Sequence, residues 1–391
     1  MTIAPDPFGF DSLPLDWLAA KPGAKWGQRP DVLNLWVADM DFRPPPVVAA
    51  ALQRLIEVGD LGYPAWGLEH SPALDAFAER AEVRYGWQLD VADCRELNDV
   101  TQGIQIALQH HTEAGDGVVV LQPSYPPFLK TVEQMQRTLV PLNGRRSADS
   151  STGWAFDWDE LDQRLDTTAA EVLLLCHPHN PTGHVFDEDE LRRIAALAER
   201  HDLLVISDEI HADLTFAPRR HLPMALFAPD RTVSIHAASK AFNLAGLRYA
   251  VMHFGPTDLR DRVNAVANHL YGEPNLFGAA AAHAAWTEGD EWLDAVLQHL
   301  DRQRHLAVDL VHEALAGVVA SVPASTYLLW VDCTALGFGD DPSEEFLRRG
   351  VRVSEGPDFG LLGVGHTRIN FATSAEVLRT AITRMASAPA S

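Results

Sequence analysis

The chain has 391 residues, and its 31 Lys and Arg against 54 Asp and Glu give a formal net charge of −23. Such an acidic surface repels nucleic-acid phosphates and anionic lipid, so we expect no nucleic-acid and no membrane partner. The length suggests two domains, and the 47% of hydrophobic residues can fill a large buried core.

The first forty or so residues are rich in Pro, Gly and Trp and show little periodicity, which predicts an extended arm. Helical spacing of apolar residues follows over 47–58 and 71–85. From about residue 100, short apolar runs alternate with helical stretches. These runs predict strands over 118–122, 172–176, 203–207, 232–236 and 249–254. Because the runs are continuous rather than alternating, we expect an α/β fold with a largely parallel sheet, covered on both faces.

One of the helices between these strands, over 187–201, begins with Asp187 and Glu190, a pattern typical of a capping box. A long amphipathic helix is predicted over 289–317, then a strand over 326–332, a helix over 343–349 and a strand over 366–371. Thr373 and Glu376 are expected to cap a last helix. We therefore expect an arm or small-domain segment over 1–45, a large domain over 46–288 and a smaller α+β domain over 289–391.

The cysteines and the N-terminus predict a location. The three cysteines are scattered and form no CxxC pair, so neither disulfides nor a zinc site are expected. The first residues lack a basic stretch followed by an apolar one, and no apolar run is long enough to span a bilayer. We expect a cytoplasmic protein.

Three candidate residues follow predicted strands, where α/β folds bind their ligands. Asn180 begins Asn-Pro-Thr-Gly, which is either an ordinary turn or a donor to a ligand oxygen. Asp208 is either a turn residue or a buried carboxylate that keeps a pyridine nitrogen protonated. Lys240 lies among small and apolar residues, in Ala-Ala-Ser-Lys-Ala-Phe, which would lower its pKa and make the amine nucleophilic.

Other segments suggest anion binding. Gly103 would let backbone N–H groups at a helix start approach a phosphate, although an ordinary helix start explains it as well. Arg248 suits a phosphate and Arg368 a carboxylate, since a guanidinium donates two parallel hydrogen bonds. Tyr125 is either a loop aromatic or a ring that stacks on a ligand. His110, His111, His177 and His179 lack a metal-ligand frame, and no metal is expected.

Taken in order, these segments resemble the class I/II aminotransferase superfamily, the fold-type-I enzymes that use pyridoxal 5'-phosphate (PLP). The resemblance implies the PLP-dependent transferase fold, with a mostly parallel seven-stranded sheet in the large domain, and it implies a homodimer and an amino-acid substrate. It implies that Lys240 carries PLP as a Schiff base, Asp208 binds the pyridine nitrogen and Tyr125 stacks on the ring. It further implies cofactor contacts from Asn180, His211, Gly103, Ile104, Ser239 and Arg248, and from Tyr63 of the neighbouring subunit. Ala38, Asn180 and Arg368 would bind the substrate.

Two features are similar to the MalY/PatB-type cystathionine β-lyases within the superfamily. One is the heptapeptide Trp-Val-Ala-Asp-Met-Asp-Phe over 36–42, and the other is His211, where aspartate-aminotransferase-like members usually carry Tyr. Ala237 departs from the phosphate-binding Ser of many relatives, and Arg248 is the choice more typical of aminotransferases. The resemblance implies α,β-elimination of L-cystathionine or another S-substituted cysteine to a thiol, pyruvate and ammonia. An aminotransferase using the same residues is the first alternative, and a PLP-fold protein that binds a transcription regulator is the second.

Overall fold

The computed structural model describes residues 6–66, 70–147, 150, 153–267 and 269–388. Its largest element is a mixed sheet in the order β2–β9–β8–β7–β6–β3–β4–β5. The strands, in that order, are Cys94–Leu97, Ala250–Phe254, Thr232–His236, Leu204–Asp208, Val172–Cys176, Gly117–Gln122, Thr138–Arg146 and Trp154–Phe156. Only β9 and β5 run against the other strands within the described residues. The mostly parallel α/β architecture is confirmed.

The described sheet has eight strands, so the expected seven was wrong by one. The five strands predicted from apolar runs, β3, β6, β7, β8 and β9, are each buried along their whole length. β4 lies between β3 and the edge strand β5 and has only two buried residues, and the other edge strand, β2, has the polar sequence Cys-Arg-Glu-Leu. β5 has three residues. Strands of this kind carry no continuous apolar signal.

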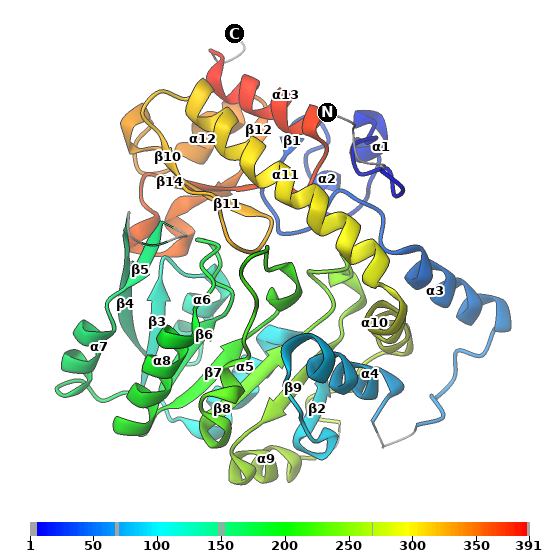
Figure 1. Ribbon diagram of the computed structural model, residues 1–391, viewed down its shortest axis with the longest axis vertical. Coiled ribbons are helices and arrows are strands. Elements are labelled where there is room, and N and C mark those ends of the chain that lie inside the picture. Colours follow the sequence, from blue (N-terminus) through cyan, green and yellow to red (C-terminus); the bar gives the residue numbers. More distant parts are fainter. Residues whose placement is uncertain (1–5, 67–69, 148–149, 151–152, 268, 389–391) are drawn as a thin grey trace.

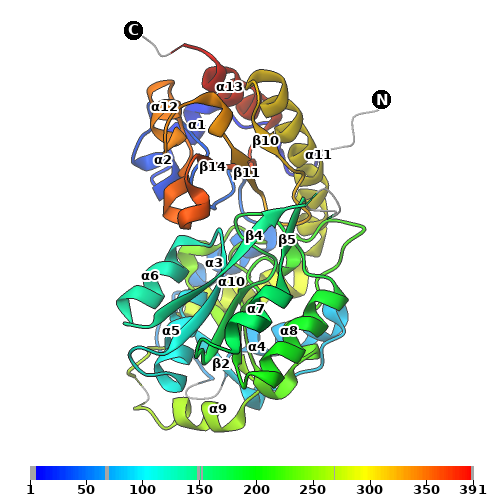
Figure 2. The same cartoon turned by 90° about the vertical axis from the view of Figure 1, so that its left-hand side faces the viewer.

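Helices cover both faces of the large sheet (Figures 1 and 2). Alternate residues of β3 point to opposite faces. On one face, Val118 and Val120 pack with α5 (Val100–His111), α6 (Pro126–Gln134) and α9 (Thr257–Asn264). On the other face, Val119 and Leu121 pack with α7 (Trp158–Leu165) and α8 (Glu188–Arg200). Near β9, this second face is covered by α3 (Pro46–Val58), α4 (Pro72–Arg80) and α10 (Leu276–Glu288). The capping box of Asp187 and Glu190 is present at the start of α8, as predicted.

A smaller antiparallel sheet lies beyond the carboxyl ends of the parallel strands (Figure 2). Its order is β10 (Val319–Ala320), β11 (Leu328–Asp332), β14 (His366–Asn370) and β13 (Ser354–Glu355). The long helix α11 (Asp290–Ala314), α12 (Pro342–Arg348) and α13 (Ala375–Ala386) pack against it. This arrangement supports the predicted division near residues 45 and 288, which stays a proposal.

Two predictions about the ends of the chain were wrong. The N-terminal arm is not simply extended: it contains α1 (Leu15–Ala19), α2 (Ala24–Gly27) and β1 (Leu33–Asn34), and β1 pairs with β12 (Val351–Arg352). The last helix is capped by Ser374, whose side chain accepts the N–H of Val377, and Thr373 precedes the cap. Among the described residues, no helix is long and apolar enough to cross a membrane.

Candidate active site

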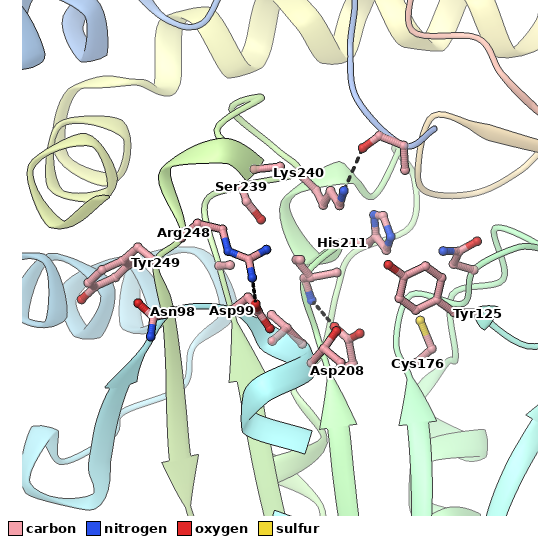
Figure 3. Close-up of a pocket in the computed structure, with 17 residues that line it drawn as sticks. Asn98, Asp99, Tyr125, Cys176, Asp208, His211, Ser239, Lys240, Arg248 and Tyr249 are labelled. Carbon is pink, nitrogen blue, oxygen red and sulfur yellow. Dashed lines mark hydrogen bonds and ion pairs between the residues drawn. The ribbon is translucent and has the colours of Figure 1, made fainter. Parts of the chain in front are cut away.

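A pocket opens where β6, β7 and β8 end beneath the smaller sheet (Figure 3). It brings together eight of the predicted site residues: Ala38, Tyr125, Asn180, Asp208, His211, Ser239, Lys240 and Arg248. The remaining lining residues are Asn98, Asp99, Val100, Thr101, Cys176, Ile210, Ala237, Ala245 and Tyr249. The chain crosses from strand to helix at this edge of a parallel sheet, which is why side chains from distant segments converge here.

Asp208 is the last residue of β7 and is 4% exposed. Its Oδ1 accepts the backbone N–H of Ile210 at 3.1 Å. Burial raises the pKa of the Asp208 carboxyl to about 7, and among the described residues no Arg or Lys forms an ion pair with it. A buried carboxyl in this position is suited to a protonated ring nitrogen, which would supply the missing positive charge.

Lys240 lies at the same pocket, on the loop that follows β8. Its Nζ donates a hydrogen bond to the carbonyl oxygen of Ala38 at 2.8 Å, drawn as a dashed line in Figure 3. Desolvation lowers the pKa of Lys240, with Arg368 acting in the same direction and Asp39 and Asp208 opposing it. The lowered pKa favours the neutral amine, the form that acts as a nucleophile and as a base.

Arg368 lies on β14 and is buried, and its guanidinium is fixed on several sides. Nη1 donates to Oδ1 of Asn180 at 3.0 Å, and Nη2 donates to the carbonyl oxygen of Trp36 at 3.0 Å and to Oγ of Ser354 at 3.1 Å. Nε has no partner among the described residues. A guanidinium held in this way can bind a carboxylate without first losing conformational entropy.

The opposite end of the pocket carries Ser239, Asn98, Tyr249 and an ion pair between Arg248 and Asp99 (Figure 3). Asp99 is also the N-cap of α5, since its Oδ1 accepts the N–H of Gln102 at 2.8 Å. The sequence reading missed Asp99. An acidic residue before a helical run was available as a signal, because Asp is a favoured N-cap residue.

Besides Arg368, which contacts the pocket residue Asn180, three predicted residues do not line the pocket. Gly103 and Ile104 are buried in α5, where a Cβ on Gly103 would meet the side chains of Ile235 and Leu97 at 3.0 Å. Val100 and Thr101, in the first turn of α5, line the pocket instead. Tyr63 lies on the surface with an exposure of 104%. The cofactor contacts expected of these three residues stay predictions.

Tyr125 and His211 face the centre of the pocket near Lys240 (Figure 3). Burial raises the pKa of Tyr125 and lowers that of His211 to about 3. Nδ1 of His211 is buried without a partner among the described residues. Cys176, at the end of β6, also lines the pocket, and burial raises the pKa of its thiol.

These observations test whether the residues fit PLP. One end offers an unpaired buried carboxyl for the pyridine nitrogen, the middle offers an amine and an aromatic ring, and the other end offers an arginine and hydroxyl groups for a phosphate. The unpartnered Nδ1 of His211 adds a polar atom that nothing in the described protein satisfies. The donor set therefore fits this cofactor.

Comparisons with known proteins agree with this geometry. The family profile described as aminotransferase class I and II matches residues 30–385. A Mycobacterium tuberculosis (strain H37Rv) protein, provisionally named cystathionine β-lyase, is 38% identical over 98% of each chain. Cystathionine β-lyase PatB of Bacillus subtilis (strain 168) is 31% identical over 92% of each chain. The crystal structure of the PLP-bound C–S lyase from Staphylococcus hominis has a TM-score of 0.88 and 26% identity, over 96% of this chain and 97% of that one.

Proposed function

The chain belongs to the class I and II aminotransferase family, and from this we propose that it is a PLP-dependent carbon–sulfur β-lyase of the cystathionine β-lyase type. It cleaves L-cystathionine or another S-substituted L-cysteine to a thiol, pyruvate and ammonia. The observation that carries the proposal is one pocket that joins the unpaired buried Asp208, the Lys240 amine and, through Asn180, the Arg368 guanidinium. Relatives and structural neighbours named as lyases support elimination.

The residues divide the work of holding the two ligands. Lys240 would attach the cofactor, Asp208 would keep a proton on its ring nitrogen, and Arg248 and Ser239 would bind its phosphate. When bound, PLP would supply an electron sink for the electron pair left on the substrate Cα. Tyr125 and His211 would enclose the ring and exclude water. Asp208 would thus serve the ring nitrogen at the acidic end of the pocket, and Arg248 would serve the phosphate at the cationic end.

Arg368 and Asn180 bind the substrate α-carboxylate, because their amide and guanidinium donors already lie together. Nζ of Lys240, as a neutral amine, would accept the proton from Cα of the bound substrate. The electron pair of the Cα–H bond would form a Cα=Cβ double bond while the Cβ–S bond breaks and the thiolate leaves with its electrons. Water would then hydrolyse the resulting enamine to pyruvate and ammonia. The carboxylate clamp orients Cα–H toward Nζ, which is the main task of the small-sheet residues in the reaction.

Incubation with L-cystathionine and no keto acid tests the proposal. We expect pyruvate and thiol in equal amounts over many turnovers. Lys240→Ala should abolish both, and borohydride should fix the cofactor on Lys240 in the unaltered chain. The matched control is Lys130→Ala, an exposed lysine on α6. If pyruvate stops after one equivalent while 2-oxoglutarate sustains amino transfer, the protein is an aminotransferase and the proposal is wrong.

We further propose that the enzyme is a homodimer in which each subunit completes the site of the other. The loop after α3 and the end of that helix expose several apolar side chains, Ile56 (59%), Val58 (71%), Leu61 (56%) and Tyr63 (104%). A second copy would cover this surface and bring Tyr63 to the phosphate end of its partner. Mixing Tyr63→Phe with Lys240→Ala subunits should restore part of the activity, since one hybrid site carries neither change. A fully active monomer in light scattering would contradict the dimer.

We keep the cytoplasm as the proposed location, consistent with the three free cysteines.

A further inference from the structure

The carbonyl oxygen of Ala38 accepts two hydrogen bonds inside the pocket. Nζ of Lys240 donates one at 2.8 Å, and the hydroxyl of Tyr327 donates the other, also at 2.8 Å. Tyr327 is 0% exposed and comes from the smaller sheet, just before β11. Its ring stands edge-on to that of His211, with 6.5 Å between the ring centroids. The two donors therefore meet at one acceptor between the two sheets.

The backbone before Tyr327 is held in an uncommon conformation. Thr326 has φ 71°, a left-handed value that is unfavourable for a β-branched residue. Two neighbouring segments hold it there: Thr326 N–H donates to Leu214 at 3.2 Å, and Ala324 N–H donates to Gly183 at 3.0 Å. Both contacts are to segments that carry site residues, since Leu214 follows His211 and Gly183 closes the turn of Asn180. Strain maintained in this way at a binding site points to a function for the residue that it positions.

We propose that Tyr327 is a positioning residue that competes with Lys240 for the Ala38 carbonyl and so keeps the Lys240 amine ready to leave that carbonyl and accept a proton. The step at Lys240 rests on the proposed function, whereas the competition for the carbonyl does not. A carbonyl oxygen that already accepts one hydrogen bond is a weaker acceptor for a second donor. An ammonium gains more from such an acceptor than a neutral amine does, so weakening the acceptor favours the neutral amine.

The Tyr327 hydroxyl keeps its proton, and so remains a hydrogen-bond donor, well above the pH at which an ordinary phenol ionises. Burial raises the pKa of Tyr327 well above its usual value, so the hydroxyl remains a donor. The other charged and titratable groups that face Lys240 are Asp39 and Asp208, which favour its ammonium form, and Arg368, which disfavours it; His211 faces it from the other side. Tyr327→Phe leaves all of these side chains in the protein and removes one donor to the Ala38 carbonyl, so we attribute a shift in the pKa of Lys240 to that shared acceptor.

The first test uses the full chain freed of PLP. Acetic anhydride labels neutral amines, and peptide mass spectrometry follows the labelling of Lys240 against pH. In Tyr327→Phe, the labelling midpoint of Lys240 should rise by about half a pH unit, which leaves roughly threefold less neutral amine below the midpoint. The control is Tyr85→Phe, which removes another buried hydroxyl, bonded to Asp213 at 2.6 Å and outside this pocket. Its Lys240 midpoint should not move.

A second variant makes the test independent of how well Tyr327→Phe folds. Incorporating 3-fluorotyrosine at position 327 keeps the size of the side chain and makes the hydroxyl a stronger donor, so the Lys240 midpoint should fall. In the PLP-loaded enzyme, the acid limb of the pH profile of kcat should move in the same directions. An unchanged midpoint in both variants would overturn the inference. Failure of the proposed function would appear separately, as an unaltered enzyme that forms no pyruvate while the labelling shifts persist.

Discussion

Replacing Asp208 with Asn separates what this carboxyl does for the reaction from what it does to the fold. The carboxyl is buried, and among the described residues its only recorded hydrogen bond comes from the N–H of Ile210. Burial raises its pKa from 3.8 to about 7. The folded protein without PLP therefore holds a proton on Asp208 that the unfolded chain releases, and its stability must fall as pH rises through this window.

The magnitude follows from those two pKa values. A group at 3.8 in the unfolded chain and about 7 in the folded protein costs about 2 kcal/mol at pH 5 and about 4 kcal/mol at pH 8. The difference, about 2 to 3 kcal/mol, is the part of the pH dependence that belongs to Asp208. Asn carries no titrating proton, so Asp208→Asn should remove this part while keeping the shape of the side chain.

Urea unfolding of the PLP-free proteins at pH 5 and pH 8 measures this difference. Relative to the unaltered chain, Asp208→Asn should gain about 2 to 3 kcal/mol between the two pH values. With PLP bound, the unaltered protein should be more stable than Asp208→Asn at pH 8, because a protonated ring nitrogen forms an ion pair with Asp208 but not with Asn. Pyruvate formation by Asp208→Asn should fall by several orders of magnitude. A stability difference that stays the same at pH 5 and pH 8 would refute the reasoning, since it would mean that Asp208 is ionised at no cost.

Two further predictions concern the carboxylate clamp and the buried histidines. An ammonium has three N–H donors against the five of a guanidinium, so Arg368→Lys cannot keep the bonds to Asn180, Trp36 and Ser354 and also hold a carboxylate with two parallel bonds. KM for the amino acid should therefore rise about 10- to 100-fold, equivalent to about 1.4 to 2.8 kcal/mol, while kcat falls less. An unchanged KM in steady-state elimination assays would argue against the clamp. Burial lowers the pKa of His177, His179, His211 and His221 to about 3 from 6.5, so the stability that their neutral forms provide is complete above pH 6.5 and is lost as pH falls toward 3. Each should cost about 2 kcal/mol at pH 5, and His177→Gln should reduce the loss of stability seen by urea unfolding between pH 7.5 and pH 5; an equal loss in this variant would mean that His177 does not contribute.

The strands that position the site were predictable because they are buried on both faces. β6, β7 and β8 each consist of five buried residues, and their carboxyl ends present Cys176, Asp208 and the loop to Lys240. The pattern of apolar residues does not predict α10, because its Ala-rich sequence is apolar on most sides and shows no amphipathic stripe. It also fails for β12 and β13, which have two residues each and depend on pairing with distant strands.

The resemblance and the structure differ in which residues of α5 lie nearest the pocket end that carries Arg248 and Ser239. The resemblance placed phosphate contacts on Gly103 and Ile104, whereas Val100 and Thr101 line the pocket. Which turn of a helix faces a ligand depends on where the helix begins, and the Asp99 cap decides that here. Helix boundaries are the least certain part of a sequence reading, and a shift of three residues moves the exposed N–H groups by almost one turn.

The segment over 36–42 explains why two parts of the chain act as one site. Its carbonyl groups accept donors from both sheets: Trp36 from Arg368, Val37 from Asn370, and Ala38 from Lys240 and Tyr327. Arg368 lies on the smaller sheet and Lys240 lies on the loop after β8 of the large sheet. Because both side chains bond to the backbone of residues 36–42, this segment sets the distance between them. A misplacement of about 1 Å in such a site can cost about a hundredfold in rate. A heptapeptide that a sequence reading treats as a family signature therefore has a physical task, because its main chain holds Arg368 and Lys240 in register.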